Sequence, residues 1–209
     1  MSEEQERREG AAAEAAEQKR EVGFAEGEHV VLRPVLEADL PELAKLLAAN
    51  PCDSKPQPWS LQRLKKRFED KDDPGLWGKD ERYFAVVRKT GGIVGFLREA
   101  CEWKDGMYWN RLYIGEEHGD RDALGRDTVA SYLAYKRKWH APRRISFDVL
   151  RVEPGIGEWL SQAGFACEVT FELSMLYRGQ PEALCVWAWL SDEVRSNLAD
   201  DGPVAGEEV

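Results

Sequence analysis

Cysteine pairs and long apolar runs are scarce in this sequence of 209 residues, and each shortage excludes a class of protein. The four cysteines lie far apart and none belongs to a CxxC pair, so we expect neither a zinc site nor a disulfide framework. The longest apolar run, 183–190, has eight residues, whereas a membrane-spanning helix needs about 20. The opening letters MSEEQERREG are polar and acidic, unlike a secretory signal. We therefore expect a reduced, cytoplasmic protein that does not enter a membrane.

Positive charge is also in short supply, because 39 acidic residues face 29 basic ones and the net charge is -10. The excess lies at the two ends: residues 1–22 hold seven acids and four bases, and residues 191–209 hold six acids and one base. The stretch between them, 23–190, carries 26 acids and 24 bases. Non-specific binding to DNA or RNA requires a surplus of Lys and Arg to displace phosphate counterions. Nucleic acid is therefore excluded as the main partner.

Apolar and aromatic residues are plentiful enough for a core, at 43% of the chain with eight Trp. Residues 1–22 contain too few of them to join it, and we expect that segment to be disordered or frayed. The acidic tail, 200–209, has the same character. The part between, 23–199, shows no internal repeat and indicates a single α/β domain.

Hydrophobic periodicity predicts the elements of this domain. We expect strands at 27–35, 82–89, 92–103, 107–115, 143–150, 167–177 and 184–190. The expected helices are one that stops at Asn50-Pro51, one near 61–68, a long one over 126–140, and a short one that ends at Gly164-Phe165. Antiparallel hairpins dominate, with one βαβ crossover through the long helix. The strand at 167–177 alternates apolar with polar residues, which predicts one buried and one wet face.

This order of elements, together with the opening HVVLRPVLEADLPELAKLL at 29–47, resembles the GNAT N-acetyltransferase superfamily over about residues 28–190. Within it, the chain looks most like enzymes that acetylate ribosomal-protein alanines or aminoglycosides. The resemblance implies a mixed, mainly antiparallel sheet that is flanked by helices and splayed at an acyl-CoA site.

Two motifs of the family locate that site. The phosphate-binding loop, Gln/Arg-x-x-Gly-x-Gly/Ala, has its nearest match in Asp120-Arg121-Asp122-Ala123-Leu124-Gly125, where small residues let backbone N–H groups approach a pyrophosphate at a helix N-terminus. The second motif is a short helix that ends in Gly-Phe, and FDVLRVEPGIGEWLSQAGF at 147–165 matches it. Glu153 takes the position of the family's Asn there, and Leu160 replaces its tyrosine acid. The implied cofactor-binding residues are Leu112, Tyr113, Ile114, Arg121, Ala123, Leu124, Gly125, Arg126 and Glu153.

Acyl transfer to an amine also requires a base that removes a proton. Glu116 and Glu117 follow the pantetheine-binding strand directly and are the best-placed candidates. His118 is next to them, and an imidazole is a side chain suited to proton transfer at neutral pH. The alternative is that all three are solvated loop residues. No spacing of residues predicts a bound metal.

The function that these features imply is acetyl transfer from acetyl-CoA to a primary amine, by direct attack with general-base assistance. The acceptor is a small molecule or a peptide N-terminus, and a homodimer is compatible with the sequence. The alternative is a GNAT-like module that has lost catalysis and binds acyl-CoA or serves as a scaffold. The imperfect phosphate loop and the absent tyrosine favour this alternative.

Overall fold

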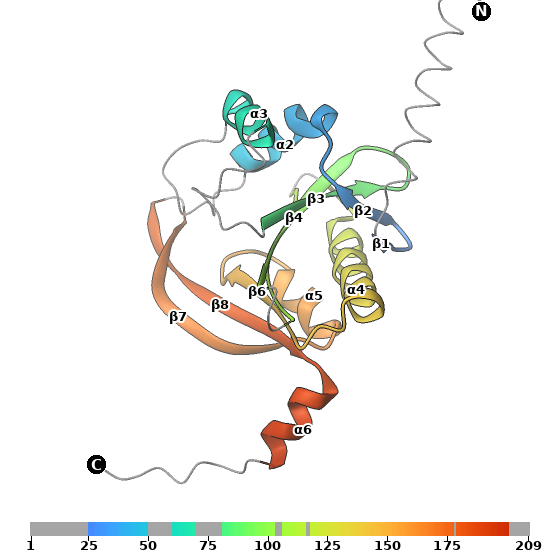
Figure 1. Ribbon diagram of the computed structural model, residues 1–209. Helices are drawn as coiled ribbons and strands as arrows, with labels where there is room; N and C mark the ends of the chain where they lie inside the picture. Colours follow the sequence, from blue (N-terminus) through green and yellow to red (C-terminus); the bar gives the residue numbers. More distant parts are fainter. Residues whose placement is uncertain are drawn as a thin grey trace, which may run out of the picture.

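A computed structural model describes residues 25–49, 60–69, 81–102, 106–115, 118–177 and 179–200 (Figure 1). The expected disordered segments, 1–22 and 200–209, lie outside these residues except for Asp200, which is the last residue of a helix. The strands are β1 Ala25–Glu26, β2 Val30–Pro34, β3 Glu81–Arg88, β4 Ile93–Glu102, β5 Met107–Ile114, β6 Arg144–Leu150, β7 Ala166–Tyr177 and β8 Gln180–Leu190. The helices are the 3-10 turn η1 Glu37–Asp39, then α2 Leu40–Ala49, α3 Leu61–Glu69, α4 Arg121–Trp139, α5 Ile156–Gln162 and α6 Asp192–Asp200.

One eight-stranded sheet organises the domain, in the order β1-β2-β3-β4-β5-β6-β8-β7. Its neighbouring strands are antiparallel except for β5 and β6, which are parallel. That pair is the expected crossover through α4, since parallel strands cannot be joined by a tight turn. The α/β fold class predicted from the sequence is confirmed.

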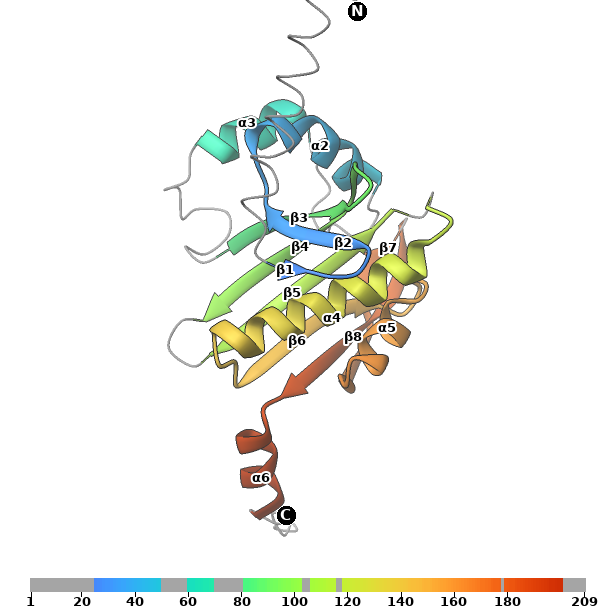
Figure 2. The ribbon, with the colours of Figure 1, turned by 90° about the vertical axis from the view of Figure 1, so that its right-hand side faces the viewer.

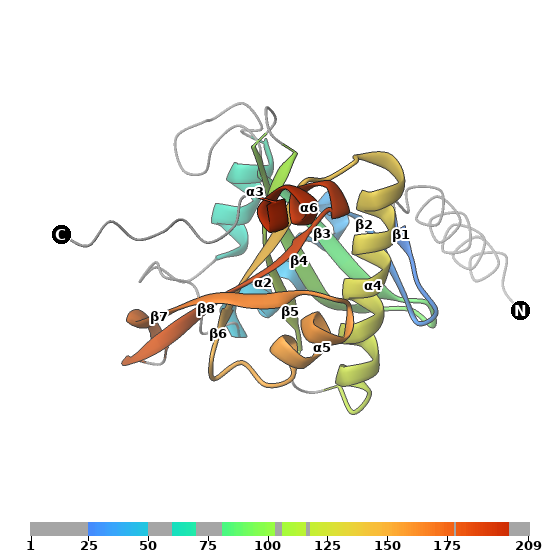
Figure 3. The same cartoon turned by 90° about the horizontal axis from the view of Figure 1, so that it is seen from below.

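Helices cover both faces of this sheet (Figures 2 and 3). The face under α4 and α5 holds the larger core, in which the side chains of Leu112, Tyr132, Phe147 and Trp159 are buried. The face under α2 and α3 holds a smaller core built around Phe96 and Tyr113. Among the described residues, no helix has the length and apolar character needed to cross a bilayer.

A buried polar network joins α4 to the sheet within the larger core. Lys136 Nζ lies 2.6 Å from Glu99 Oε2, and both side chains are at most 2% exposed. The Tyr132 hydroxyl lies 2.5 Å from the same oxygen and 2.7 Å from Asn110 Oδ1. Burial and the neighbouring Glu99 carboxylate raise the pKa of Tyr132 well above its usual value, so its hydroxyl remains protonated.

The turn between β1 and β2 is fastened to α4 by one carboxylate. Asp127 accepts the backbone N–H groups of Glu28, His29 and Val30 at 2.7–2.9 Å. A Cβ on Gly27 would lie 2.3 Å from Asp127 Oδ1, so the residue at position 27 must be glycine for this approach.

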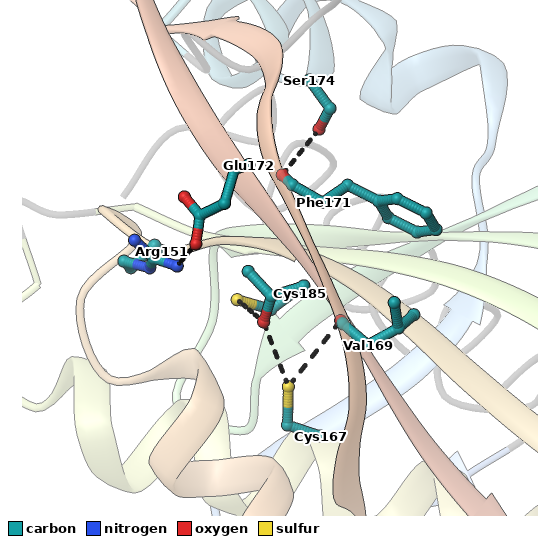
Figure 4. A network of polar contacts seen from close by, with 8 residues as sticks. Arg151, Cys167, Val169, Phe171, Glu172, Ser174 and Cys185 are labelled. Atoms are coloured by element: carbon teal, nitrogen blue, oxygen red, sulfur yellow. Dashed lines mark hydrogen bonds and ion pairs between the residues drawn. The ribbon is translucent and has the colours of Figure 1, made fainter.

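The predicted half-buried character of 167–177 is wrong. Both faces of β7 are largely exposed, including the side chains of Phe171 at 49% and Leu173 at 72%. Register shifts between Cys167 and Val169 and between Phe171 and Met175 break the alternation on which the prediction depended. The strand makes local polar contacts instead, such as the ion pair of Glu172 with Arg151 (Figure 4).

Candidate functional site

The two parallel strands of the sheet separate halfway along their length. β5 pairs with β6 from Met107 to Asn110, opposite Arg144 to Phe147. Beyond that point β5 continues to Ile114 beside β4, and β6 continues to Leu150 beside β8. We call the stretch between 111–114 and 148–150 the β5–β6 opening. In open α/β sheets, ligands bind where neighbouring strands part in this way.

The N-terminus of α4 closes one end of this opening. Arg121 Nε donates to the carbonyl of Ile114 at 3.1 Å, and its Nη1 donates to the carbonyl of Pro154 at 2.6 Å. The guanidinium also lies 4.8 Å from the ring centroid of Trp159 on α5. A single side chain therefore bridges the end of β5 and the connection that follows β6.

Two carboxylates flank Arg121, and each has a partner. Asp120 Oδ1 lies 2.6 Å from Arg88 Nη2 on β3. Asp122 Oδ1 accepts the indole N–H of Trp159 at 3.1 Å. The positive end of the α4 dipole favours acidic residues at these positions. Asp120 therefore has a cationic partner, whereas the partner of Asp122 is a neutral indole on α5.

The structure corrects the predicted phosphate loop. α4 begins at Arg121 rather than at Arg126, so residues 121–125 form helical turns instead of a loop. Leu124 is 1% exposed and belongs to the larger core. A Cβ on Gly125 would lie 2.3 Å from the Trp159 ring, so the close approach that requires a small residue there is made by α5. Ala123 is partly buried and Arg126 is exposed; their predicted contacts with a cofactor remain predictions.

Glu153 organises the turn that follows β6. Its Oε2 accepts the backbone N–H of Leu150 at 2.7 Å, and its own N–H donates to the Leu150 carbonyl at 2.9 Å. Its Oε1 lies 3.4 Å from Arg111 Nη2 on β5. Glu153 thus holds the two sides of the β5–β6 opening together, and its predicted contact with a cofactor remains a prediction.

Asp148 is a candidate site residue that the sequence analysis did not single out. It continues β6 just past the last β5–β6 pair, on the face of the sheet opposite α4, because its neighbours Phe147 and Val149 point into the larger core. Burial raises the pKa of Asp148 above its usual value of 3.8, and the nearby guanidiniums of Arg111 and Arg98 oppose that rise. One feature of the sequence could have indicated Asp148: it is a single acidic residue between the apolar residues Phe147 and Val149 in a buried strand.

The three predicted bases precede α4 in the sequence, and the structure describes one of them. Glu116 and Glu117 fall outside the residues that the structure describes. His118 is partly buried, and its carbonyl accepts the N–H of Arg121 at 3.1 Å. The role of all three as bases remains a prediction. In the described part of the chain, no group of three or more His, Cys, Asp or Glu side chains is arranged to hold a metal ion.

Comparison with known proteins identifies the fold. No family model and no curated protein matches the chain. Among solved structures, the chain matches spermidine N-acetyltransferase from Vibrio cholerae in complex with CoA and spermine, with a TM-score of 0.68, 16% identity, and coverage of 80% of this chain and 98% of that one. It also matches Mycobacterium smegmatis RimJ in complex with CoA-disulfide, with a TM-score of 0.65, 15% identity, and coverage of 83% and 89%.

A third match belongs to the branch that the sequence resembles. The ribosomal-protein-S5-alanine acetyltransferase from Vibrio fischeri aligns with a TM-score of 0.65 and 17% identity, over 80% of this chain and 96% of that one. The chain therefore has the GNAT N-acetyltransferase fold, as its sequence predicted. These neighbours are acetyltransferases, and two of them are CoA complexes.

Proposed function

We propose that this chain transfers an acetyl group from acetyl-CoA to a primary amine. The observation that supports the proposal most directly is the β5–β6 opening, which has the N-terminus of a long helix at one end and a partly buried carboxylate beside it. Acetyl-CoA would supply an acyl group already activated as a thioester. The chain's own residues would hold it, position the amine and accept a proton.

The backbone at the end of β5 and the start of α4 would hold the co-substrate. The carbonyl of Ile114 already accepts a hydrogen bond from Arg121, so this group is able to accept one from a pantetheine amide in its place. The released guanidinium would remain at the positive end of α4, where it and the helix dipole favour a diphosphate. Asp122 opposes this attraction. In this scheme, binding of CoA therefore requires Arg121 to give up its hydrogen bond to the Ile114 carbonyl and to form one with a phosphate.

Asp148 joins Glu116, Glu117 and His118 as a proposed base. Its carboxylate would take a proton from the ammonium of the acceptor, and the neutral nitrogen would then attack the thioester carbonyl. The C–N bond forms as the C–S bond breaks, the nitrogen gives its second proton to the departing sulfur, and CoA leaves as the free thiol. A base is most effective when its pKa lies near the working pH, and burial shifts the pKa of Asp148 upward, in that direction.

The test is thiol release from acetyl-CoA over a panel of primary amines. Asp148→Asn should lower kcat by roughly 10²–10⁴-fold, the contribution typical of a general base, while the Kd for CoA stays unchanged. Glu116→Gln, Glu117→Gln and His118→Gln form the comparison set. Full activity of Asp148→Asn, with a loss in one of the other three, would move the base to that residue. No turnover with any amine would contradict the proposed function.

A second candidate is a module that has lost catalysis. It is favoured by the unneutralised carboxylate of Asp122 in the first turn of α4 and by the occupation of the Ile114 carbonyl by Arg121. Calorimetry with CoA separates the candidates, because an enzyme must bind it. Absence of binding at millimolar CoA would support the scaffold, and tight binding without turnover would support a CoA-binding module.

A further inference from the structure

Directly opposite residues form a row across the last three strands of the sheet, starting at Asp148. Asp148 on β6 is opposite Val186 on β8, and Val186 is opposite Val169 on β7. Residues that are opposite each other in antiparallel strands point to the same face of a sheet. The side chains of Val186 and Val169 therefore lie on the face of Asp148, opposite α4.

The next row on this face contains only apolar side chains. Leu150 on β6 is opposite Leu184 on β8, and Leu184 is opposite Phe171 on β7. Figure 4 shows the β7 members of both rows, Val169 and Phe171, on one side of the strand and Glu172 on the other. We call the apolar residues of the two rows the β6–β7 apolar strip: Leu150, Val169, Phe171, Leu184 and Val186.

The strip is buried beside Asp148 and exposed toward the edge of the sheet. Leu150 and Val186 are 0% and 6% exposed, whereas Val169 is 39% exposed and Phe171 is 49% exposed. β7 is the outermost strand, and two strand spacings, roughly 10 Å, separate it from β6. Exposed apolar side chains that adjoin one another are typical of interaction surfaces. The exposed end of the strip therefore lies about two strands away from the carboxylate.

The two rows contain one acidic residue and no other charge. Asp148 is that residue, and the remaining members that the register assigns to the rows are apolar. The acidic residues of β7 have partners elsewhere, because Glu168 pairs with Arg144 and Glu172 with Arg151. A ligand that lies along the rows would therefore meet a carboxylate at one end and apolar side chains at the other.

We infer that the acetyl acceptor is a primary amine whose far end is apolar, such as a long alkylamine. This inference rests on the proposed function. The amine would lie at Asp148, and the apolar end would cover Phe171 and Val169. The strip is continuous with the proposed base, and this continuity favours the acceptor over a second copy of the chain as its occupant. A polyamine would instead bring a second cation onto apolar side chains, and removing an unpaired charge from water is costly.

The experiment compares ethylamine, octylamine and the diamine of the same length as octylamine. We expect kcat/KM to be at least about tenfold higher for octylamine than for ethylamine, a difference of about 1.4 kcal/mol, because burial of about two methylene groups accounts for it. Octylamine should exceed the diamine by a similar factor, since the two differ in the charge at the far end. Equal values for ethylamine and octylamine, or a preference for the diamine, would overturn the inference and leave the proposed function intact.

Variants assign the preference to the strip. Phe171→Ser should lower the ratio of kcat/KM for octylamine over ethylamine by at least about threefold, because apolar contact area is lost, and Phe171→Leu should keep most of the ratio. Val169→Thr provides a second test if Phe171→Ser does not fold. Leu176→Ser is the matched control. Leu176 belongs to the same strand and is 62% exposed, but it is opposite Pro181, an odd number of positions from Leu184 and so on the other face.

Loss of the ratio in the control would contradict the assignment, and so would a ratio that survives both Phe171→Ser and Val169→Thr. Sedimentation of the parent protein separates acceptor binding from self-association. A dimer that Phe171→Ser converts to a monomer would give the exposed end of the strip to a second copy and overturn the inference.

Binding without acetyl-CoA separates the recognition of the acceptor from its acetylation. In calorimetric titration, octylamine should bind the parent protein and the Leu176→Ser variant more tightly than the Phe171→Ser variant. If this difference is present and no amine is acetylated, the proposed function fails and the recognition of an apolar amine stands. If amines are acetylated and octylamine binds the parent no more tightly than ethylamine does, the recognition fails alone.

Discussion

Arg121 donates a hydrogen bond of 3.1 Å to the carbonyl of Ile114, so a side chain of α4 occupies the backbone group at the end of β5. The same guanidinium holds the carbonyl of Pro154 and packs over Trp159. These contacts make Arg121 the residue through which the start of α4, the end of β5 and the α5 region meet. A ligand that binds the Ile114 carbonyl must compete with it.

Arg121→Gln should weaken CoA binding by roughly tenfold, because a charge-assisted hydrogen bond contributes about 1.5–3 kcal/mol. Isothermal titration with CoA measures the effect. Arg137→Gln, at an exposed position in the same helix, is the control and should bind CoA like the parent. Tighter binding by Arg121→Gln would mean that the arginine blocks the opening instead of holding a phosphate.

Gly125→Ala should destabilise the fold by about 1–3 kcal/mol, the usual cost of overpacking. The new methyl group would start 2.3 Å from the Trp159 ring, and α5 would have to shift. Urea unfolding measures the change. Gly119→Ala is the matched control, since a Cβ there meets nothing within 4 Å. Equal stability of the two variants would contradict this account of α4–α5 packing.

Lys136→Met should destabilise the protein by about 3–5 kcal/mol, because it leaves the buried Glu99 carboxylate without its cation. The double variant Glu99→Gln with Lys136→Met should recover much of that loss, since no buried charge remains. Lys138→Met, at an exposed position two residues further along α4, should change the free energy of unfolding by less than about 0.5 kcal/mol. A double variant that is no more stable than Lys136→Met would contradict the explanation.

His140 should make stability fall as the solution becomes mildly acidic. Burial and the nearby Lys136 lower its pKa below the usual 6.5, and Glu99 opposes this shift. The unfolded chain therefore takes up a proton first as the pH falls through about 6.5, and stability is lost from there down to the folded-state pKa. His140→Gln should flatten this part of the curve when urea unfolding is compared at about pH 7.5 and pH 5.5. An unchanged slope would assign the effect to other groups.

Most of the sheet was predictable because its strands alternate or are continuously apolar between clear turn residues. The start of α4 was not, because the letters Gly119 to Asp122 resemble a loop. In the structure, the side chain of Arg121 donates hydrogen bonds to the carbonyls of Ile114 and Pro154. The side chain of Asp122 accepts one from Trp159. These contacts exist only in the folded chain. The short helix α6 was also missed, since its sequence is polar and acidic and has only weak apolar periodicity.

The candidate site was predictable only where it depends on strand order. The expected crossover places the end of 107–115 beside the start of α4, and the structure has that arrangement. The placement of Asp148 near Arg98 and Arg111 depends on the registers of three strands, which no local pattern of letters specifies. Gly125 illustrates the same limit: a small residue indicates a close neighbour, and only the fold reveals that this neighbour is Trp159.

The buried position of Lys136 also determines how the protein would respond to chemical labelling. Its amine is enclosed with Glu99 at 2% exposure, whereas Lys138 on the same helix is exposed. An amine-reactive reagent would modify Lys138 in the native protein and reach Lys136 only when α4 leaves the sheet. The rate at which Lys136 is modified, followed by mass spectrometry, would therefore measure how often the domain opens globally.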